Sequence, residues 1–246
     1  MLDEVVANCW PAQVEITHHR WRHRAASGVT RRANSTLVLG DVDDRDRALR
    51  STSDFHTAHD SPTRLLVSDA SAPAWVRPHL EREGFRPDAE TLMLTGPVQP
   101  AAPSGRWRVE ADDEVTDQWF AAFWAIEAGR RHAGREAVMR ATLLRPSLPA
   151  SFISLLDDDR VVSVGQVVID RGIGCVQCLA TDPDHRGRGA ASEVIGQLAT
   201  EASRLGATAL LAAVMETNAA SRATFARAGF TERHRYRYYE RRSGAK

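Results

Sequence analysis

The chain has 246 residues, enough for one large domain or two modest ones, and its 32 basic residues balance its 32 acidic ones. A hydrophobic fraction of 43% without net charge is typical of a soluble globular protein and argues against a disordered chain. No apolar run is long enough for a membrane span, and Met1–Glu4 lacks a basic signal-peptide start, so we expect a cytoplasmic protein without membrane contact.

The first hundred residues alternate between strand-like and helical segments. In chain order we predict a strand at 13–24 before a turn at Ser27-Gly28, a strand at 34–39, a helix at 43–59, a strand at 64–68, a helix at 74–83 and a strand at 91–94. Five arginines gather near the start of this half: Arg20, Arg22, Arg24, Arg31 and Arg32. Because acidic residues are interspersed among them, we expect a solvated face here and no nucleic-acid partner.

The segment 95–105 contains three prolines and two glycines, a composition that predicts a linker at 97–106. After it we predict a helical region at 113–142, a hairpin of strands 151–156 and 161–169, a strand at 175–181, a helix at 190–205 that ends at Gly206, a strand at 209–214, a helix from Asn218 and a strand around Tyr236.

The three cysteines, Cys9, Cys175 and Cys178, form neither a full disulfide set nor a four-cysteine zinc site. The pair Cys175-x-x-Cys178 has the spacing of a redox dithiol. It lies within a predicted strand, however, where residues three apart face opposite sides. We therefore interpret these cysteines as small buried hydrophobic residues and expect no metal.

A phosphate-binding loop is predicted where the strand ending at Thr181 gives way to the helix beginning at Ala190. The first turn of a helix has unpaired N–H groups, glycines allow a close approach of the backbone, and arginines add positive charge. The stretch Arg186-Gly187-Arg188-Gly189 combines these features. A Walker loop would need Lys-Ser or Lys-Thr where Ala190-Ala191 stands, and a dinucleotide fingerprint would need glycine in place of Ser192.

The remaining pattern, Arg186-x-x-Gly189-x-Ala191 after the turn Thr181-Asp182-Pro183, resembles the acetyl-CoA pyrophosphate loop of the GCN5-related N-acetyltransferases. A downstream element agrees, because Asn218 and Gly229-Phe230 match the family's Asn-x-x-Ala-x-x-Leu-Tyr and Gly-Phe elements. Ser221 replaces the usual alanine and Phe225 the usual tyrosine. The resemblance covers about Trp107 to Arg242.

The N-terminal half repeats the order helix, Gly84-Phe85, strand, but it contains no such loop. The chain therefore resembles bacterial tandem acetyltransferases with a degenerate N-terminal half. This resemblance implies an α/β fold of the α+β type, with a central mixed β-sheet flanked by helices in each of two units. The units are a degenerate domain at 1–96 and an acetyl-CoA-binding domain at 107–246, joined by the linker 97–106. The first unit either provides a surface that shapes the substrate site or binds a partner, or it is a scaffold only.

The resemblance implies acetyl-CoA as co-substrate, no metal, and acetyl transfer to a primary amine of a small molecule by direct attack in a ternary complex. The cofactor contacts that it implies are Leu179, Ala180, Thr181, Arg186, Gly187, Arg188, Gly189, Ala190, Ala191, Ser192, Asn218 and Phe225. The alternatives are an acyl-CoA sensor or scaffold without turnover, acetylation of a peptide or protein, and another acyl-CoA reaction on the same scaffold.

An ammonium ion cannot attack a thioester, so a base or a water chain must remove a proton. We predict Glu216 as this base, ahead of His234, His132 and Glu127. In the family, a tyrosine commonly protonates the leaving thiolate, and Phe225 at that position has no proton to give. The substitutes are Tyr236, Tyr238, Tyr239 or water, and Tyr236 is our candidate. A backbone N–H near Leu179–Thr181 is expected to polarise the thioester carbonyl.

Overall fold

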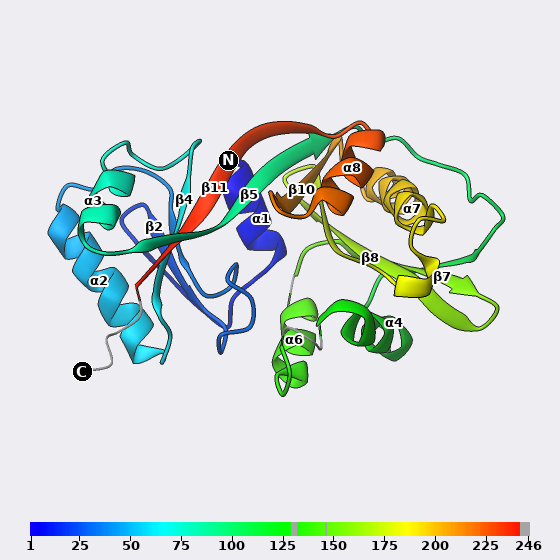
Figure 1. Ribbon diagram of the computed structural model, residues 1–246, viewed down its shortest axis with the longest axis horizontal. Coiled ribbons are helices and arrows are strands. Elements are labelled where there is room, and N and C mark those ends of the chain that lie inside the picture. Colours follow the sequence, from blue (N-terminus) through cyan, green and yellow to red (C-terminus); the bar gives the residue numbers. More distant parts are fainter. Residues whose placement is uncertain (129–131, 146, 242–246) are drawn as a thin grey trace.

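Strands from both halves of the chain join in a single mixed sheet in the computed structural model (Figure 1). The structure describes residues 1–128, 132–145 and 147–241. In this part of the chain the sheet has eleven strands in the order β1-β2-β3-β4-β11-β5-β10-β9-β8-β7-β6. Neighbours are parallel at β3–β4 and β9–β10 and antiparallel at the other junctions. The predicted mixed sheet flanked by helices is confirmed.

The elements before the predicted linker are α1 (Leu2–Cys9), β1 (Val14–His18), β2 (Trp21–Ala25), β3 (Thr36–Val38), α2 (Arg45–Ala58), β4 (Thr63–Ser68), α3 (Val76–Arg82) and β5 (Arg86–Gly96). The predicted strand at 13–24 is instead a hairpin, because the chain turns at His19 with a φ of 55°. Helix α1 was not predicted. It forms because Val5, Val6 and Cys9 are buried against the sheet, a contact that local periodicity does not reveal.

The later elements are β6 (Arg108–Asp112), α4 (Asp117–Phe123), the π-helical segment η1 (Trp124–Ala128), α6 (Glu136–Leu143), β7 (Ala150–Asp157), β8 (Arg160–Asp170), β9 (Ile173–Thr181), the 3₁₀ turn η2 (Pro183–His185), α7 (Ala190–Arg204), β10 (Ala209–Met215), α8 (Ala219–Arg227) and β11 (Thr231–Arg241). The predicted helical region 113–142 is therefore interrupted. Residues 129–131 of that region and the end of the predicted unit 107–246 lie outside the described residues.

Strands of the two halves alternate in the middle of the sheet. The last strand, β11, lies between β4 and β5 of the N-terminal half, with Tyr236 opposite Ser68 on one side and Thr91 on the other. Strand β5 in turn separates β11 from β10, and Figure 1 shows β5 and β11 running together at the centre. The division into units 1–96 and 107–246 stays a prediction, since their strands share one sheet.

Helices cover both faces around the C-terminal strands. Helices α7 and α8 pack on one face, and α1, α4 and α6 pack on the other. The segment 97–106 has no regular secondary structure and follows α7, where Gln197 Nε2 donates to the Ala101 carbonyl (3.1 Å) and the Ser104 amide donates to Glu193 (2.8 Å). Among the described residues, no helix is both long and apolar enough to cross a membrane.

Candidate functional site

Strands β9 and β10 separate where the site is predicted. Their parallel pairing ends at Ala212 opposite Val176, although β9 continues to Thr181 and β10 to Met215. Beyond this point β10 stays paired with β5, and β9 stays paired with β8. The facing edges of β9 and β10 therefore have backbone groups without a strand partner, and these groups are able to bond a ligand that enters the opening.

A β-bulge lies beside this opening. Val164 pairs with Ala180 and Gln166 pairs with Gln177, so Cys178 and Leu179 together lie opposite Gly165. Cys178 has a φ of 53°, in the left-handed region that non-glycine residues rarely adopt.

Contacts from both faces of the sheet hold this bulge. The Trp119 indole donates to the carbonyls of Gly165 (3.2 Å) and Ile153 (3.1 Å). On the other face, a Cβ on Gly165 would lie 2.5 Å from a Val194 methyl of α7, so only glycine fits there.

The bulge corrects one prediction about the cysteines. Because the extra residue shifts the alternation of β9, Gln177 and Cys178 both lie on the face that Cys175 occupies. The Cys178 thiol lies 3.7 Å from the Gln166 side-chain oxygen, and burial raises the pKa of Cys178 to about 12. Cys178 is thus a neutral thiol at physiological pH. Among the residues that the structure describes, no group of three or more His, Cys, Asp or Glu side chains is arranged to hold a metal.

The loop after β9 has the backbone of an open anion cradle. Gly187 and Gly189 have φ values of 73° and 92°, and a Cβ on either would have no atom within 4 Å, so the space above them is open. Gly189 is the N-cap of the 15-residue helix α7. Asp182 fixes the entry to the loop by accepting from the Asp184 amide (2.9 Å) and pairing with Arg160 (2.5 Å).

The cradle carries positive charge that is not neutralised. Arg186 and Arg188 are exposed, and within the described part of the chain neither forms an ion pair with a carboxylate. Arg186 Nε donates to the Thr181 carbonyl (3.2 Å), which holds this side chain at the end of β9. The first turn of α7 adds unpaired N–H groups and the positive end of its dipole. Ala190 is buried beneath this turn, Ala191 is half-buried and Ser192 is exposed.

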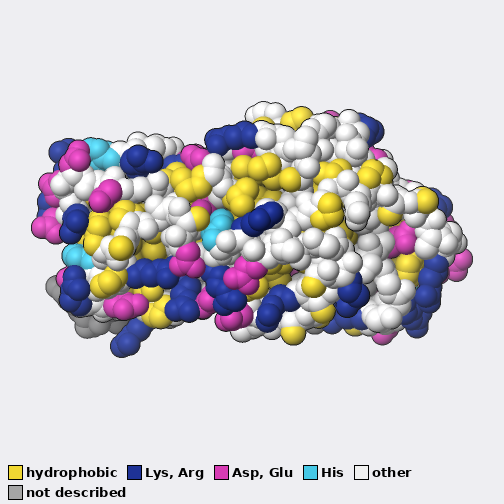
Figure 2. Space-filling view, turned by 90° about the horizontal axis from the view of Figure 1, so that it is seen from above, with side chains coloured by type: hydrophobic (Ala, Val, Ile, Leu, Met, Phe, Trp, Pro, Cys, Tyr) yellow, Lys and Arg dark blue, Asp and Glu magenta, His cyan; other side chains and the backbone are white. Residues whose placement is uncertain are grey.

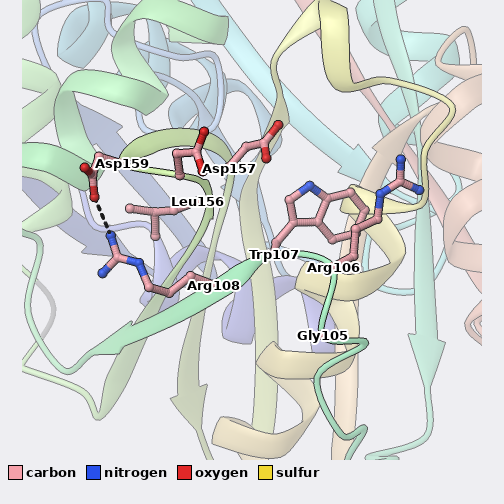
Figure 3. A pocket seen from close by; sticks show the side chains of 8 residues that line it. Gly105, Arg106, Trp107, Arg108, Leu156, Asp157 and Asp159 are labelled. Atoms are coloured by element: carbon pink, nitrogen blue, oxygen red, sulfur yellow. Dashed lines mark hydrogen bonds and ion pairs between the residues drawn. The ribbon is translucent and has the colours of Figure 1, made fainter.

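An open hollow of about 570 Å³ adjoins the loop, between the end of the 97–106 segment and the β7–β8 turn. Figure 3 shows the Trp107 ring between Arg106 and Asp157 at this hollow. Asp157 is bonded to His185 of the loop (3.1 Å), so the wall of the hollow supports the cradle from outside. Its other walls carry Asp158 and Asp159, which disfavour a diphosphate there.

The predicted contacts after β10 have structural roles in this state. The Asn218 side chain caps α8 by accepting from the Ser221 amide (3.0 Å). The Phe225 ring is buried and meets Phe230 edge-on, with 4.9 Å between the ring centres. Asn218 therefore lies at the start of α8, close to the end of β10, whereas Phe225 lies about two turns further along the helix.

The three predicted catalytic residues are not brought together. Glu216 bonds Arg235 (2.9 Å), a half-buried cation that also binds Glu90 (3.0 Å). The hydrogen bond from Arg235 is the first of several contacts that lower the pKa of Glu90. Because neighbouring residues of a strand point to opposite faces, Arg235 and Glu216 lie on the other side of the sheet from His234.

His234 and Tyr236 share the face that α1 covers. His234 Nε2 lies 3.0 Å from Oδ1 of Asp3, whose side chain is fully buried and whose Oδ2 has no hydrogen-bond partner in the structure. In the sheet, His234 pairs with Met93, which pairs with Ala213, the first residue of β10 beyond its last pair with β9. Tyr236 is buried and its ring meets Tyr238 edge-on at 5.6 Å.

The N-terminal half reaches this face through residues that sequence reasoning did not assign to the site. Gln177 donates to the Cys9 carbonyl (2.9 Å) and accepts from Arg32 (2.6 Å). The expectation of solvated arginines is wrong for Arg24, which is only 2% exposed, donates to the Ala7 carbonyl of α1 (2.9 Å) and pairs with Glu15 (3.1 Å). In the sequence, the alternation of Arg22 and Arg24 near Glu15 was the one indication that these arginines share a strand face with a carboxylate. Their burial could not be predicted from it, because the burial depends on α1.

Charged side chains of both signs are mixed on the one face that Figure 2 shows. Figure 2 shows basic and acidic side chains interspersed over the face seen from above. This pattern agrees with the zero net charge and differs from the single-signed surface typical of nucleic-acid binding.

Comparisons with known proteins agree with this geometry. Residues 110–230 match the model of the acetyltransferase (GNAT) family. The chain is 25% identical over 244 residues to the uncharacterized N-acetyltransferase YobR of Bacillus subtilis, and the match covers 96% of each chain.

Solved structures share the fold along most of the chain. A GCN5-related N-acetyltransferase from Kribbella flavida has a TM-score of 0.68 at 16% identity, covering 95% of this chain and 91% of its own. A tandem GNAT protein from the clavulanic acid biosynthesis pathway has a TM-score of 0.61 at 12% identity, covering 82% and 70%. Residues 110–230 therefore form a domain of the acetyltransferase (GNAT) family, which implies an acetyltransferase that uses acetyl-CoA.

Proposed function

We propose that the protein transfers an acetyl group from acetyl-CoA to the primary amine of a small molecule, by direct attack within a ternary complex. The observation that carries this proposal is the continuity of two features, the open cradle at Gly187–Gly189 and the opening between β9 and β10. A diphosphate in the cradle would leave the attached pantetheine arm facing the unpaired edge of β9. We propose with it that residues 107–246 bind acetyl-CoA and that residues 1–96 help to shape the acceptor side.

In the cradle, both the backbone N–H groups and the arginine side chains would bind the diphosphate. The amides from Gly187 to Ser192 are at the start of α7, where unpaired N–H groups and the helix dipole favour an anion. Arg186 and Arg188 would add charge-assisted hydrogen bonds. Asn218, just after β10, and Phe225, on α8, would border the arm on its other side.

Polarisation of the thioester is assigned to the backbone of Leu179–Thr181. These residues follow the bulge, and their edge facing β10 has no strand partner. An N–H fixed there would donate to the thioester carbonyl and more strongly to the oxyanion that forms on attack, which lowers the barrier. No enzyme nucleophile is needed, which agrees with the neutral Cys178 thiol.

For removal of the amine proton we propose His234 rather than Glu216. The buried Asp3 carboxylate orients the imidazole on the face that carries Gln177 and Cys178, whereas Glu216 is held by Arg235 on the other side. Two strand spacings separate His234 from the edge of β10, about 10 Å. The proton would therefore pass through water. Tyr236 stays the candidate proton donor to sulfur, and a thiolate also leaves without help because thiols have a pKa near 8.5.

A second function, CoA sensing without turnover, is favoured by one observation. Phe225 replaces the tyrosine that serves as acid in the family, and its ring is fully packed against Phe230. A sensor would keep the cradle and the opening and lose the chemistry.

The test is a thermal-shift titration with acetyl-CoA, CoA and ATP, followed by a thiol-release assay over small amines. A ligand at a hundred times its Kd adds about 2.7 kcal/mol of stability. Stabilisation by acetyl-CoA and CoA, but not ATP, with thiol release on adding a small amine is the expected result. Stabilisation without turnover on any small amine or peptide would favour the sensor. No response to either CoA ligand would overturn the proposal.

A further inference from the structure

Arg32 lies between the two halves of the chain, beside the acceptor end of the opening. It belongs to the loop between β2 and β3, and its guanidinium stacks over Trp10 with 5.5 Å to the ring centre. Nη1 donates to the Gln177 side-chain oxygen (2.6 Å). Gln177 directly precedes Cys178, so the guanidinium lies one residue from the bulge where the thioester is expected.

Arg32 forms no ion pair with a carboxylate in the described part of the chain. Burial acts to lower the pKa of Arg32, but the electrostatic influence of Tyr236, Tyr238, Cys175 and Cys178 outweighs burial and raises this pKa, which puts these four groups near the guanidinium. The Cys178 thiol and the Tyr238 hydroxyl are neutral at physiological pH, because burial raises the pKa of Cys178 to about 12 and that of Tyr238 well above its usual value.

Two other arginines of the N-terminal half are paired with carboxylates, unlike Arg32. Arg24 and Arg64 are more deeply buried than Arg32 or comparably so, and they pair with Glu15 (3.1 Å) and Glu240 (2.6 Å). Arg32 bonds only the neutral Gln177 among the described side chains, and its Nε and Nη2 donate to no described group. A half-buried guanidinium with two unused donor positions is suited to bind a carboxylate through two parallel hydrogen bonds.

We infer that Arg32 binds a carboxylate of the acceptor, so that the acceptor is an amino acid or another small amine with a carboxylate a few bonds from its nitrogen. This inference rests on the proposed function. Gln177 is held by the Cys9 carbonyl (2.9 Å) and keeps the guanidinium in place. Because Arg32 lies close to the bulge where the thioester is expected, the carboxylate and the amine of the acceptor must be separated by only a few bonds.

The experiment compares pairs of acceptors that differ only in the carboxylate. Glycine with glycinamide, β-alanine with β-alaninamide and L-leucine with L-leucinamide are assayed by thiol release, with kcat/KM expressed per unprotonated amine. The wild type is expected to prefer the acids. Arg32→Gln is expected to lower kcat/KM for the acids about 10- to 100-fold, mainly through KM, with little change for the amides or in the KM of acetyl-CoA.

The neighbouring Arg31 provides a matched control, since it forms a half-exposed ion pair with Asp88 (2.7 Å). Arg31→Gln is expected to keep the wild-type preference. Where Arg32→Gln does not fold, as judged by circular dichroism, Arg32→Lys is used, and it is expected to show a smaller loss confined to the acids. Turnover of amides and neutral amines with no effect of Arg32 would overturn the inference and leave the proposed function standing. Absence of turnover on every amine would overturn both.

Discussion

Gly189 is the N-cap of α7 and has a backbone conformation that favours glycine. Its φ of 92° costs another residue about 1–2 kcal/mol, and the space above it is open toward the cradle. Gly206, just past the other end of α7, also has a positive φ (83°) and open surroundings. Equivalent substitutions at the two glycines therefore cause similar backbone strain, and a difference between them reports on the location of Gly189 beside the cradle.

We expect Gly189→Glu to abolish binding of acetyl-CoA, weakening it by about 100-fold or more, because the carboxylate repels the diphosphate and fills its site. Gly206→Glu carries the same charge and a similar strain and is expected to bind normally. Isothermal titration with CoA measures both. Equal affinities for the two variants would show that the diphosphate does not lie at the start of α7.

His234 is the second residue whose substitution is informative. We expect His234→Gln to lower kcat about 100-fold, because glutamine cannot take up the amine proton, with the KM of acetyl-CoA unchanged. Steady-state thiol-release kinetics at varied acetyl-CoA concentration measure this. His79→Gln, on the distant helix α3, is the control. If His234→Gln keeps full activity and Glu216→Gln loses it, then Glu216 is the base as the sequence predicted.

At the scale of elements, the Trp119 indole helps to hold the bulge in β9 from one face of the sheet. Trp119 is fully buried, and its Nε1 bonds two carbonyls of β7 and β8. We expect Trp119→Phe to lower the free energy of unfolding by about 2–4 kcal/mol, since it leaves buried carbonyls with one donor fewer and loses packing. Urea unfolding measures this loss.

Trp75 provides the comparison for this substitution. Its Nε1 donates to an exposed carboxylate of Asp41 (2.7 Å), so Trp75→Phe is expected to cost about 1 kcal/mol or less. A smaller loss at Trp119 than at Trp75 would contradict the role given to the indole in holding the bulge.

The predicted elements and the observed ones differ for physical reasons that particular residues show. Helix α7 and the hairpin β7–β8 were predicted because their apolar residues follow a regular period. The bulge at Cys178 was not, since it depends on Gly165 admitting α7 and on Trp119 reaching across the sheet. Helix α1 was missed because its stabilising contacts lie more than a hundred residues away in β8, β9 and β10.

At the scale of the whole molecule, the sheet joins both halves of the chain. Strand β11 has β4 on one side and β5 on the other, and β10 has β5 on its outer side. We expect a fragment of residues 104–246 to aggregate, because removing β4 and β5 exposes both edges of β11 and one edge of β10. Size-exclusion chromatography and amide NMR spectra measure this.

A full-length chain cut inside the 97–106 segment is the matched control for the fragment. It keeps every strand, so we expect it to stay associated, folded and active. A folded and active 104–246 fragment would mean that the second unit is independent of the first.

Stability toward acid is a further property of the whole fold. His23 Nδ1 and His56 Nε2 share the Thr36 hydroxyl (2.9 and 3.2 Å), and burial is the first cause that lowers the pKa of both histidines to about 4. Between pH 6.5 and 4 the unfolded chain therefore binds more protons than the folded chain, and stability falls as pH falls. We expect a loss of about 2 kcal/mol per histidine from pH 7 to pH 5.

Urea unfolding at the two pH values measures this loss. The double variant His23→Gln/His56→Gln, although less stable at neutral pH, is expected to show a flatter dependence on pH over this range. An unfolding free energy of the wild type that is equal at pH 7 and pH 5 would contradict the assignment.

The sequence by itself determined most of the elements, the glycine-containing loop before α7 and the family resemblance, because periodicity, glycine and helix-start chemistry are local properties of the chain. Tertiary structure decided the rest. The bulge that turned Cys178 onto the face of Cys175, the pairing of Asp3 with His234 and the approach of Arg32 to Gln177 all join residues remote in sequence. Such contacts depend on how the strands of both halves order in one sheet, and no local pattern encodes that order.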